Sequence, residues 1–211
     1  MTTLLLVRHG RTAANSRGVL AGRTPGIGLD ETGITQARSL AERIGNRTIH
    51  AVITSPLERC QQTVASLGVT PVVDERFVEC DYGKWTGQAI SDLRQDPLWT
   101  RVQHQPSAMT FPGGESMEQM QMRALSALRE WQQRIADEHG ADATWVVCSH
   151  EDVIKSMVAG VVGLAFDLFQ RIVIANAAIT EIRFTADRPY LVRLNDAARA
   201  FPGAGASGSA D

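Results

Sequence analysis

Short apolar runs alternate with amphipathic segments along most of the chain. Short runs rich in Val, Ile and Leu are typical of buried strands, whereas apolar positions that recur every three or four residues are typical of helices. The strands predicted on this basis are residues 3–7, 51–54, 71–73, 145–148, 180–184 and 190–194. Helices are predicted for residues 33–44, for a segment opened by Ser55 and Pro56, for a long segment starting at Ser116, and for a segment from about Glu151.

Two of the predicted helices begin with residues that favour a helix start. Ser is a good N-cap and Pro fits the first helical position, so Ser55 and Pro56 together indicate a helix N-terminus. Ser116 and Gln119 have the spacing of a capping box. The apolar stripe of that long helix begins with Met117, for which we expect core packing.

The order of the elements predicts the fold class. Strands that alternate with helices favour an α/β fold: a three-layer, doubly wound, mostly parallel central sheet with helices on both faces. At about 150 residues per domain, the chain fits one domain over residues 1–200. Residues 76–115 are less regular and contain three Pro, so we expect a small cap insertion there. Residues 201–211 are mostly Gly, Ala and Ser, which predicts a disordered tail.

Composition narrows the class of protein. The 211 residues contain 21 basic and 23 acidic side chains, and the net charge of −2 argues against a nucleic-acid partner. No apolar run reaches the ~18 residues of a membrane span, and the N-terminal run, which ends at Arg8, is too short for a signal peptide. We therefore expect a cytoplasmic protein with no membrane partner, in which Cys60, Cys80 and Cys148 are free thiols.

Two predicted strands end in a histidine. His9 follows the first strand between Arg8 and Gly10, and His150 follows the strand at 145–148. Because ligands bind outside the carboxyl ends of the strands in a parallel sheet, both imidazoles are expected at one edge. Gly10 would allow a tight turn and the close approach of a ligand.

Other polar residues are expected at the same edge. Arg59 lies in the first turns of the helix after the second strand, Asn15 follows the first histidine, and Glu79 lies in the irregular insert. Arg presents a fork of donors to phosphate, and neutral imidazole is a nucleophile. The combination would suit a doubly charged oxyanion.

At these positions the chain resembles the histidine phosphatase superfamily, the phosphoglycerate-mutase-like proteins. The resemblance covers about residues 4–195, and the motifs occur in the order of the family. The matching motifs are residues 6–12 with Asn15, 29–33 with Gln36 and Ala37, 55–63, Glu79 with 82–83, 85–87, 112–116 and 149–150.

The resemblance implies catalysis through a phosphohistidine. His9 would attack phosphorus, and Glu79 would protonate the leaving alkoxide and then activate the hydrolytic water. His150 would be the third catalytic residue, against the phosphoryl oxygens. No metal and no cofactor is implied, because Arg and His supply the positive charge and the sequence offers neither a Walker loop nor a metal-ligand cluster.

Phosphate binding would fall to four further groups: Arg8, Asn15, Arg59 and the backbone N–H of Glu151. The last residue departs from the family, in which Gly usually follows the second histidine. Its acid could simply complement the helix dipole. Alternatively, its carboxylate could face the phosphate and weaken binding, or pair with Arg11, which stands where the family usually has Glu or Gln.

The resemblance leaves three functions open. We predict a phosphomonoester hydrolase for a small phosphorylated metabolite; the alternatives are a cofactor-dependent phosphoglycerate mutase and a weakly active phospholigand-binding member. Hydrolysis is favoured because Cys80, with a thiol expected to be partly exposed, follows Glu79 where mutases carry Arg, and because the insert has no adjacent basic pair. A homo-oligomer is left open. Trp85, Trp99 and Phe111 could line an apolar wall or form the cap core.

Overall fold

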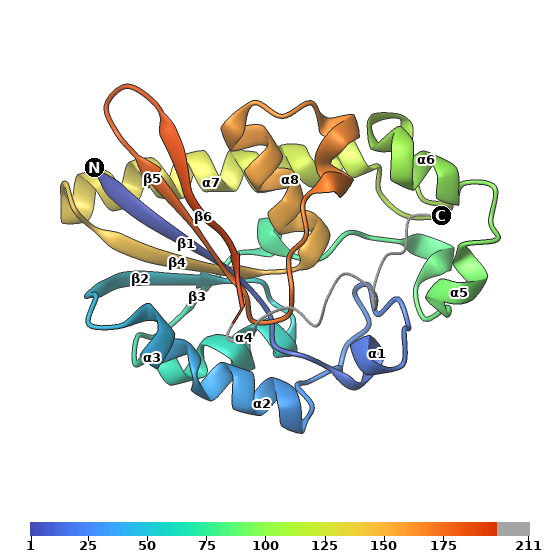
Figure 1. The fold of residues 1–211 in the computed structure, drawn as a ribbon, viewed down its shortest axis with the longest axis horizontal. Helices are drawn as coiled ribbons and strands as arrows, with labels where there is room; N and C mark the ends of the chain where they lie inside the picture. Colours follow the sequence, from blue (N-terminus) through green and yellow to red (C-terminus); the bar gives the residue numbers. More distant parts are fainter. Residues whose placement is uncertain (198–211) are drawn as a thin grey trace.

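A six-stranded sheet forms the centre of the computed structural model, which describes residues 1–197 (Figure 1). The strand order is β3-β2-β4-β1-β5-β6. The first four strands are parallel, whereas β5 runs antiparallel to β1 and β6 antiparallel to β5, so the sheet is mostly parallel as predicted. The strands are β1 (Thr2–Arg8), β2 (Ile49–Thr54), β3 (Val72–Val73), β4 (Thr144–Ser149), β5 (Ile179–Phe184) and β6 (Pro189–Asp196).

Helices cover both faces of the sheet. In Figure 1, α2, α3 and α4 lie below the sheet and α7 and α8 lie above it, which confirms the expected three layers. The α-helices are α1 (Ala13–Ser16), α2 (Glu31–Arg38), α3 (Leu40–Ile44), α4 (Glu58–Val64), α5 (Ile90–Leu93), α6 (Trp99–His104), α7 (Met117–His139) and α8 (Glu151–Val162). The 3-10 helices are η1 (Ala65–Leu67), η2 (Glu75–Phe77), η3 (Gly83–Trp85), η4 (Pro106–Ala108) and η5 (Phe166–Arg171).

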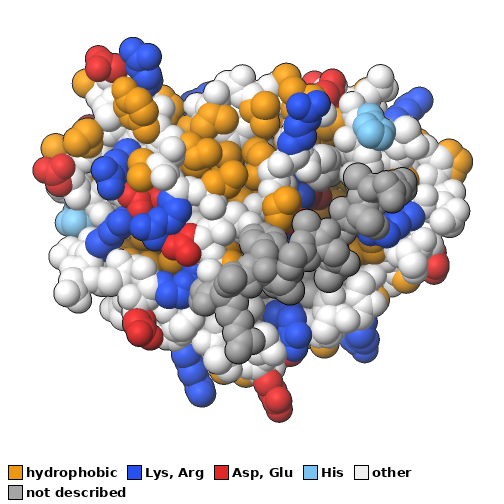
Figure 2. All heavy atoms as spheres, in the orientation of Figure 1, with side chains coloured by type: hydrophobic (Ala, Val, Ile, Leu, Met, Phe, Trp, Pro, Cys, Tyr) orange, Lys and Arg blue, Asp and Glu red, His pale blue; other side chains and the backbone are white. Residues whose placement is uncertain are grey.

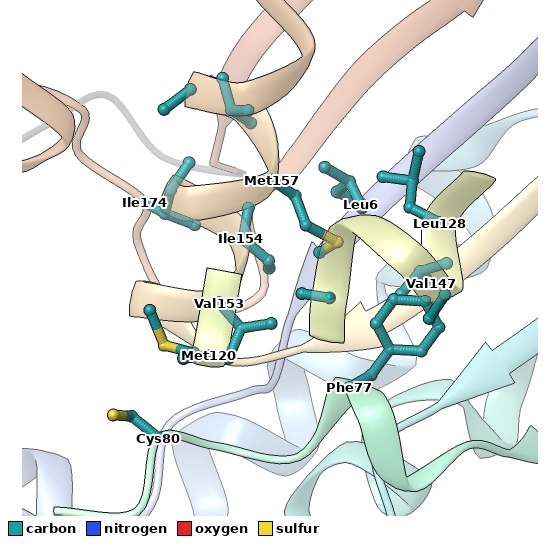
Figure 3. Close-up of a cluster of buried hydrophobic side chains, with 14 of the residues drawn as sticks. Leu6, Phe77, Cys80, Met120, Leu128, Val147, Val153, Ile154, Met157 and Ile174 are labelled. Carbon is teal, nitrogen blue, oxygen red and sulfur yellow. The ribbon is translucent and has the colours of Figure 1, made fainter. Parts of the chain in front are cut away.

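The core has two parts, one on each face of the sheet. Successive side chains of a strand point to opposite faces, so Leu6 of β1 joins the larger cluster and Leu5 the smaller one. Figure 3 shows the larger cluster, in which Leu6 and Val147 lie near Leu128 of α7 and Met157 of α8. Burial on both faces explains why β1 and β4 read as continuous apolar runs, whereas the two valines of the edge strand β3 are exposed.

The helix starts test the capping predictions. Ser116 and Gln119 form the predicted capping box at the start of α7. The predicted helix at 33–44 is instead two helices, which break at Ser39. The first of these starts earlier than predicted, because Asp30 caps it by accepting a hydrogen bond from the Gly33 N–H at 2.8 Å.

The insert at residues 76–115 contains η3, α5, α6 and η4. Trp85 and Phe111 are buried and pack edge to face, with ring centroids 5.3 Å apart. Trp85 also stacks on Trp99 at 6.2 Å. For Trp85 and Phe111 this confirms the interpretation as a packed core rather than an exposed apolar wall.

All three cysteines are free and buried. The expected partial exposure of Cys80 is wrong, because its side chain belongs to the larger core cluster (Figure 3).

Figure 2 shows apolar side chains gathered where β6 and α8 lie in Figure 1, and Tyr190, Val192 and Leu194 of β6 are exposed.

Within residues 1–197, no helix combines the length and the apolar character that a membrane span needs. The tail predicted at 201–211 lies outside the described residues.

Candidate active site

The carboxyl ends of β1 and β4 bring the two histidines together. Arg8 pairs with Ser149 at the end of the two strands, and His9 and His150 follow directly. The two imidazole centroids are 5.3 Å apart. Arg59 reaches them from the first turn of α4, with its Nη2 atom 3.3 Å from His150 Nδ1.

His9 is held as a neutral imidazole with one free nitrogen. Its Nδ1 atom lies 2.8 Å from the carbonyl oxygen of Gly10. A carbonyl oxygen only accepts, so Nδ1 carries the proton and Nε2 keeps its lone pair. Burial, and then the charges of Arg8 and Arg59, hold the pKa of His9 well below its usual value. Nε2 is therefore available as a nucleophile at neutral pH.

The loop after β1 is fixed to its neighbours by close backbone packing. The Gly10 N–H donates to Thr63 Oγ1 at 2.9 Å, and Thr63 donates in turn to the Arg59 carbonyl at 2.6 Å. A Cβ atom at Gly10 would lie 2.8 Å from the Gly33 carbonyl oxygen. Glycine is needed here for this close approach of two backbones, not for the tight turn assumed from the sequence.

His150 is oriented by Ser55 and Arg59. A guanidinium has no acceptor, so the Arg59 contact makes Nδ1 of the imidazole the acceptor, and Nε2–H donates to Ser55 Oγ at 2.8 Å. Burial, and then Arg59, lower the pKa of His150 well below its usual value. The prediction that Ser55 and Pro56 start a helix is wrong: α4 begins at Glu58. Besides its bond to the imidazole, Ser55 Oγ accepts the Leu57 N–H at 3.4 Å and no N–H of the helix.

Two guanidinium groups present donors without acceptors. Arg8 Nη1 donates to the Ile174 carbonyl at 2.6 Å, and Arg59 Nη2 donates to the Gly22 carbonyl at 2.7 Å. Within residues 1–197, the buried atoms Arg8 Nε, Arg59 Nε and Arg59 Nη1 have no hydrogen-bond partner. A buried donor without a partner costs about 1–3 kcal/mol. These groups, beside two imidazoles, can bind an anion with several oxygens.

Glu79 lies beside this pair of imidazoles. Its Oε1 atom accepts a hydrogen bond from the Cys80 N–H at 2.9 Å, and Oε2 lies 3.7 Å from His150 Nδ1. The residue is only 8% exposed. Burial, and then the negative charge of Asp152, raise the pKa of Glu79 to about 7, against the opposing effect of Arg59. A carboxyl group with this pKa can donate and accept protons near neutral pH.

Asp152, on the first turn of α8, is a second, largely buried acid at this position, with a side chain 17% exposed. The Tyr82 hydroxyl donates to its Oδ2 atom at 2.8 Å. Lys155 is 4.0 Å away, too far for a hydrogen bond. Burial raises the pKa of Asp152 as well. Two neighbouring carboxyl groups therefore compete for protons here.

Charged side chains hold the loop that carries Glu79. Arg123 donates to the Val78 carbonyl at 2.7 Å and to the Glu79 carbonyl at 3.2 Å, and it pairs with Glu115 at 2.7 Å. Arg23 also donates to the Glu79 carbonyl, at 2.8 Å, and pairs with Glu115. Sequence reasoning gave no role to these three side chains. The signal was present for Glu115, which belongs to the matched motif at 112–116.

Asn15 uses its side-chain oxygen to close the loop after β1. Oδ1 accepts from the Thr12 N–H at 3.1 Å, as part of the capping box of α1. It also accepts from Asn176 Nδ2 at 3.3 Å. Only the amide Nδ2 of Asn15 is left to donate to an anion.

Glu151 opens α8, as predicted, and its side chain contacts Arg8 of the site. The carboxylate lies 2.6 Å from Arg8 Nη1 and 2.7 Å from Lys155 Nζ. The predicted alternative of a pair with Arg11 is wrong, because Arg11 Nε binds Asp30 at 2.8 Å.

Comparison with known proteins decides the family. The model of the histidine phosphatase superfamily (branch 1) matches residues 4–197. The chain belongs to this superfamily. The bifunctional protein Rv2228c of Mycobacterium tuberculosis is 32% identical over 92% of this chain, and the chain spans only 53% of that relative. Thus the chain spans about half the length of the first mycobacterial relatives that it matches.

Relatives of similar length carry two kinds of name. Phosphoserine phosphatase 1 of Hydrogenobacter thermophilus is 26% identical, with 92% of both chains covered. A Yersinia pestis protein with a phosphoglycerate mutase name, GpmB, is 28% identical, with 90% of this chain and 88% of the relative covered. Among solved structures, phosphoserine phosphatase of Entamoeba histolytica in complex with 3-phosphoglyceric acid superposes with a TM-score of 0.82 at 26% identity, with 94% and 98% covered.

Proposed function

We propose that this histidine phosphatase hydrolyses the phosphomonoester of a small metabolite through a phosphohistidine on His9. One observation carries the proposal. A neutral, buried imidazole with a free Nε2 stands beside two guanidinium groups whose buried N–H donors have no acceptor within residues 1–197. A phosphoryl group satisfies those donors and offers an electrophile to the imidazole.

The first half of the reaction transfers the phosphoryl group to the enzyme. Nε2 of His9 attacks phosphorus, and the bond from phosphorus to the ester oxygen breaks. The protonated Glu79 carboxyl group donates its proton to that oxygen, so an alcohol leaves. Arg8 and Arg59 stabilise the charge on the three equatorial oxygens, with Asn15 Nδ2 and the Glu151 N–H as further donors. His150, which donates to Ser55 and accepts from Arg59, orients the Arg59 guanidinium beside them.

The second half releases phosphate. Glu79, now a carboxylate, takes a proton from a water molecule that attacks phosphorus. The bond from phosphorus to Nε2 breaks, and its electron pair returns to the imidazole. Inorganic phosphate leaves, and Glu79 is again protonated for the next turnover.

Two sequence features favour water over a phosphorylated sugar acid as the acceptor. Cys80 follows Glu79 where the mutases of the family carry Arg, and the thiol is buried in the core, so it cannot bind a substrate carboxylate. The insert at 76–115, which we propose is the cap that selects the substrate, has no adjacent basic pair. Mutase activity is the second candidate, supported by the relative named for it.

A metabolite-phosphate screen with acid-labile ³²P labelling tests the proposal. We expect release of inorganic phosphate from several monoesters and a labelled enzyme that loses its label in acid. Conversion of 3-phosphoglycerate to 2-phosphoglycerate without phosphate release would favour the mutase. Binding without release or labelling would identify a phospholigand-binding member.

The location, substrate class and oligomeric state of the protein are also proposals. We infer a cytoplasmic location from the three buried free thiols, which are typical of reducing compartments. The net charge of −2 supports a small-molecule substrate rather than nucleic acid. The exposed apolar residues of the edge strand β6 would suit a homo-oligomer.

A further inference from the structure

One terminal nitrogen of the Arg8 guanidinium, Nη1, is already bound by protein oxygen atoms. Its Nη1 atom donates to the Ile174 carbonyl and lies 2.6 Å from Glu151 Oε2. Its Nε atom is buried and has no partner within residues 1–197. A guanidinium binds a phosphate best through two parallel N–H groups. With Nη1 occupied, the pair that is left is the edge formed by Nε and Nη2.

The charge of Glu151 is balanced on its other side. Lys155, one turn further along α8, lies 2.7 Å from Glu151 Oε1 and is only 7% exposed. Its ammonium group also contacts Gln170 Oε1 at 3.3 Å. Burial would raise the pKa of Glu151, but Arg8 and Lys155 outweigh it and hold that pKa below its usual value. The carboxylate is therefore charged at neutral pH.

The three side chains form a charged row: Lys155, Glu151 and Arg8. Two positive charges and one negative charge leave a net charge of +1, which equals that of Arg8 alone. An uncompensated acid on this turn would repel a phosphate dianion. A compensated acid keeps the tether to Arg8 and removes most of that repulsion.

We propose that Glu151 and Lys155 are positioning residues for phosphate: Glu151 holds Arg8 with its Nε–Nη2 edge toward the phosphoryl group, and Lys155 offsets the charge of Glu151. The proposal rests on the proposed function of the site. A long side chain that is ordered before the ligand arrives loses less conformational entropy on binding. Repulsion of phosphate by Glu151, one of the interpretations of the sequence, is thereby replaced by support of phosphate binding.

The test measures the dissociation constant of inorganic phosphate by calorimetry, in wild type and in Glu151→Gly, Lys155→Met and the double variant. Lys155→Met leaves the acid uncompensated, so we expect binding to weaken by about 10-fold. Glu151→Gly frees Arg8, and we expect a weakening of about 3-fold to 5-fold. In the double variant, loss of Lys155 should weaken binding less than it does in the presence of Glu151, because the closer of its two acidic partners is gone.

Two further variants separate positioning from folding. Glu151→Gln keeps a carbonyl oxygen for Arg8 Nη1, so it should recover most of the affinity lost in Glu151→Gly. Glu118→Gln, an exposed acid in the first turn of α7, is the matched control and should bind phosphate like wild type. With p-nitrophenyl phosphate, the Glu151 and Lys155 variants should raise KM more than they lower kcat.

Several results would overturn the inference. Tighter phosphate binding in Glu151→Gly would show that the acid repels the ligand. An equal effect of Lys155→Met with and without Glu151 would show that Lys155 does not act through the acid. Because calorimetry needs no turnover, these results stay distinct from failure of the proposed function, which would appear as phosphate binding without hydrolysis in wild type.

Discussion

The two halves of the site are built by different forces. The half around His9 is fixed by backbone hydrogen bonds at the strand ends: the His9 N–H donates to the Ser149 carbonyl at 3.0 Å, and the Arg8 N–H donates to the Ala178 carbonyl at 3.2 Å. The half around Glu79 lies in a loop whose carbonyl oxygens are held by the side chains of Arg123 and Arg23. The nucleophile and Arg8 thus lie at the end of a strand, with Arg59 beside them in the first turn of α4, whereas the acid depends on distant side chains. Substitutions should therefore separate the two halves.

The largest effect is expected in the first half. His9→Ala removes the nucleophile, and turnover should fall by more than about 1,000-fold. The fold should persist, because the backbone bonds of residue 9 do not need the imidazole. Acid-labile ³²P labelling of wild type but not of the variant is the measurement, with His104→Ala on the exposed end of α6 as a control. Label that persists without His9 would refute the assignment.

The next effect separates the acid from the phosphate donors. Glu79→Gln should slow esters with poor leaving groups by about 100-fold or more. It should slow p-nitrophenyl phosphate far less, because p-nitrophenolate leaves without a proton. In wild type, kcat/KM for an alkyl phosphate should decline above about pH 7, where Glu79 loses its proton. Equal losses on both kinds of ester would remove Glu79 from this role.

The Glu79 carboxyl group should also make the free energy of unfolding depend on pH. Its pKa is about 7 in the folded protein against 4.5 ordinarily, so the folded state binds more protons between these values. The stability contributed by the protonated form is complete below about pH 4.5 and is lost as the pH rises through about 7. Glu79→Gln lacks this titration. Its free energy of unfolding, measured with urea, should therefore rise relative to that of wild type over this pH window, by about 1–3 kcal/mol. A constant difference between pH 5 and 8 would show that the pKa is not raised.

A smaller effect is expected from the support of the second half. Arg123→Met leaves three backbone carbonyls and Glu115 without their shared donor. We expect a loss of about 2–4 kcal/mol in the free energy of unfolding and a fall in kcat of roughly 10-fold. Phosphate affinity should change little. Arg134→Met, which breaks an exposed pair on the same helix, should cost less than about 0.5 kcal/mol. A large loss of phosphate affinity in Arg123→Met would mean that the halves are not separate.

The smallest effect is expected at Arg11. This side chain pairs with Asp30 and is 42% exposed, so Arg11→Ala should change stability by less than about 0.5 kcal/mol. Phosphate inhibition of p-nitrophenyl phosphate hydrolysis should be that of wild type. A clear change in phosphate inhibition at low salt would restore the idea that Arg11 acts on Glu151.

The sequence predicted most of the fold and the first half of the site. Apolar runs located the strands, and the rule that ligands bind at the carboxyl ends of parallel strands placed His9, His150 and Arg59 together. These residues lie within two positions of a strand end or in the first turn of a helix. Their location therefore depends on local structure and sheet order alone.

What the sequence did not predict depends on side-chain partners far away along the chain. Ser55 looked like a helix cap but orients His150, and Glu151, for which a pair with Arg11 was one of the alternatives, pairs with Arg8. A polar residue at an element boundary can bind the backbone beside it or a side chain brought close by the fold. Periodicity cannot distinguish these cases, because it describes one element at a time.

The strand order also has a consequence for how the chain folds. β1 lies between β4 and β5, so Leu5 pairs with Val146 on one side and with Glu181 on the other. At the pace of translation, on the order of 10 s separates synthesis of the first strand from that of its nearest partner. During this time its apolar residues have no sheet to join. Such long-range pairing predicts slow folding and a need for chaperones while the chain is being made. Thus β1, the strand that precedes His9, is synthesised before its partners β4 and β5 and can pair only when most of the chain has been made.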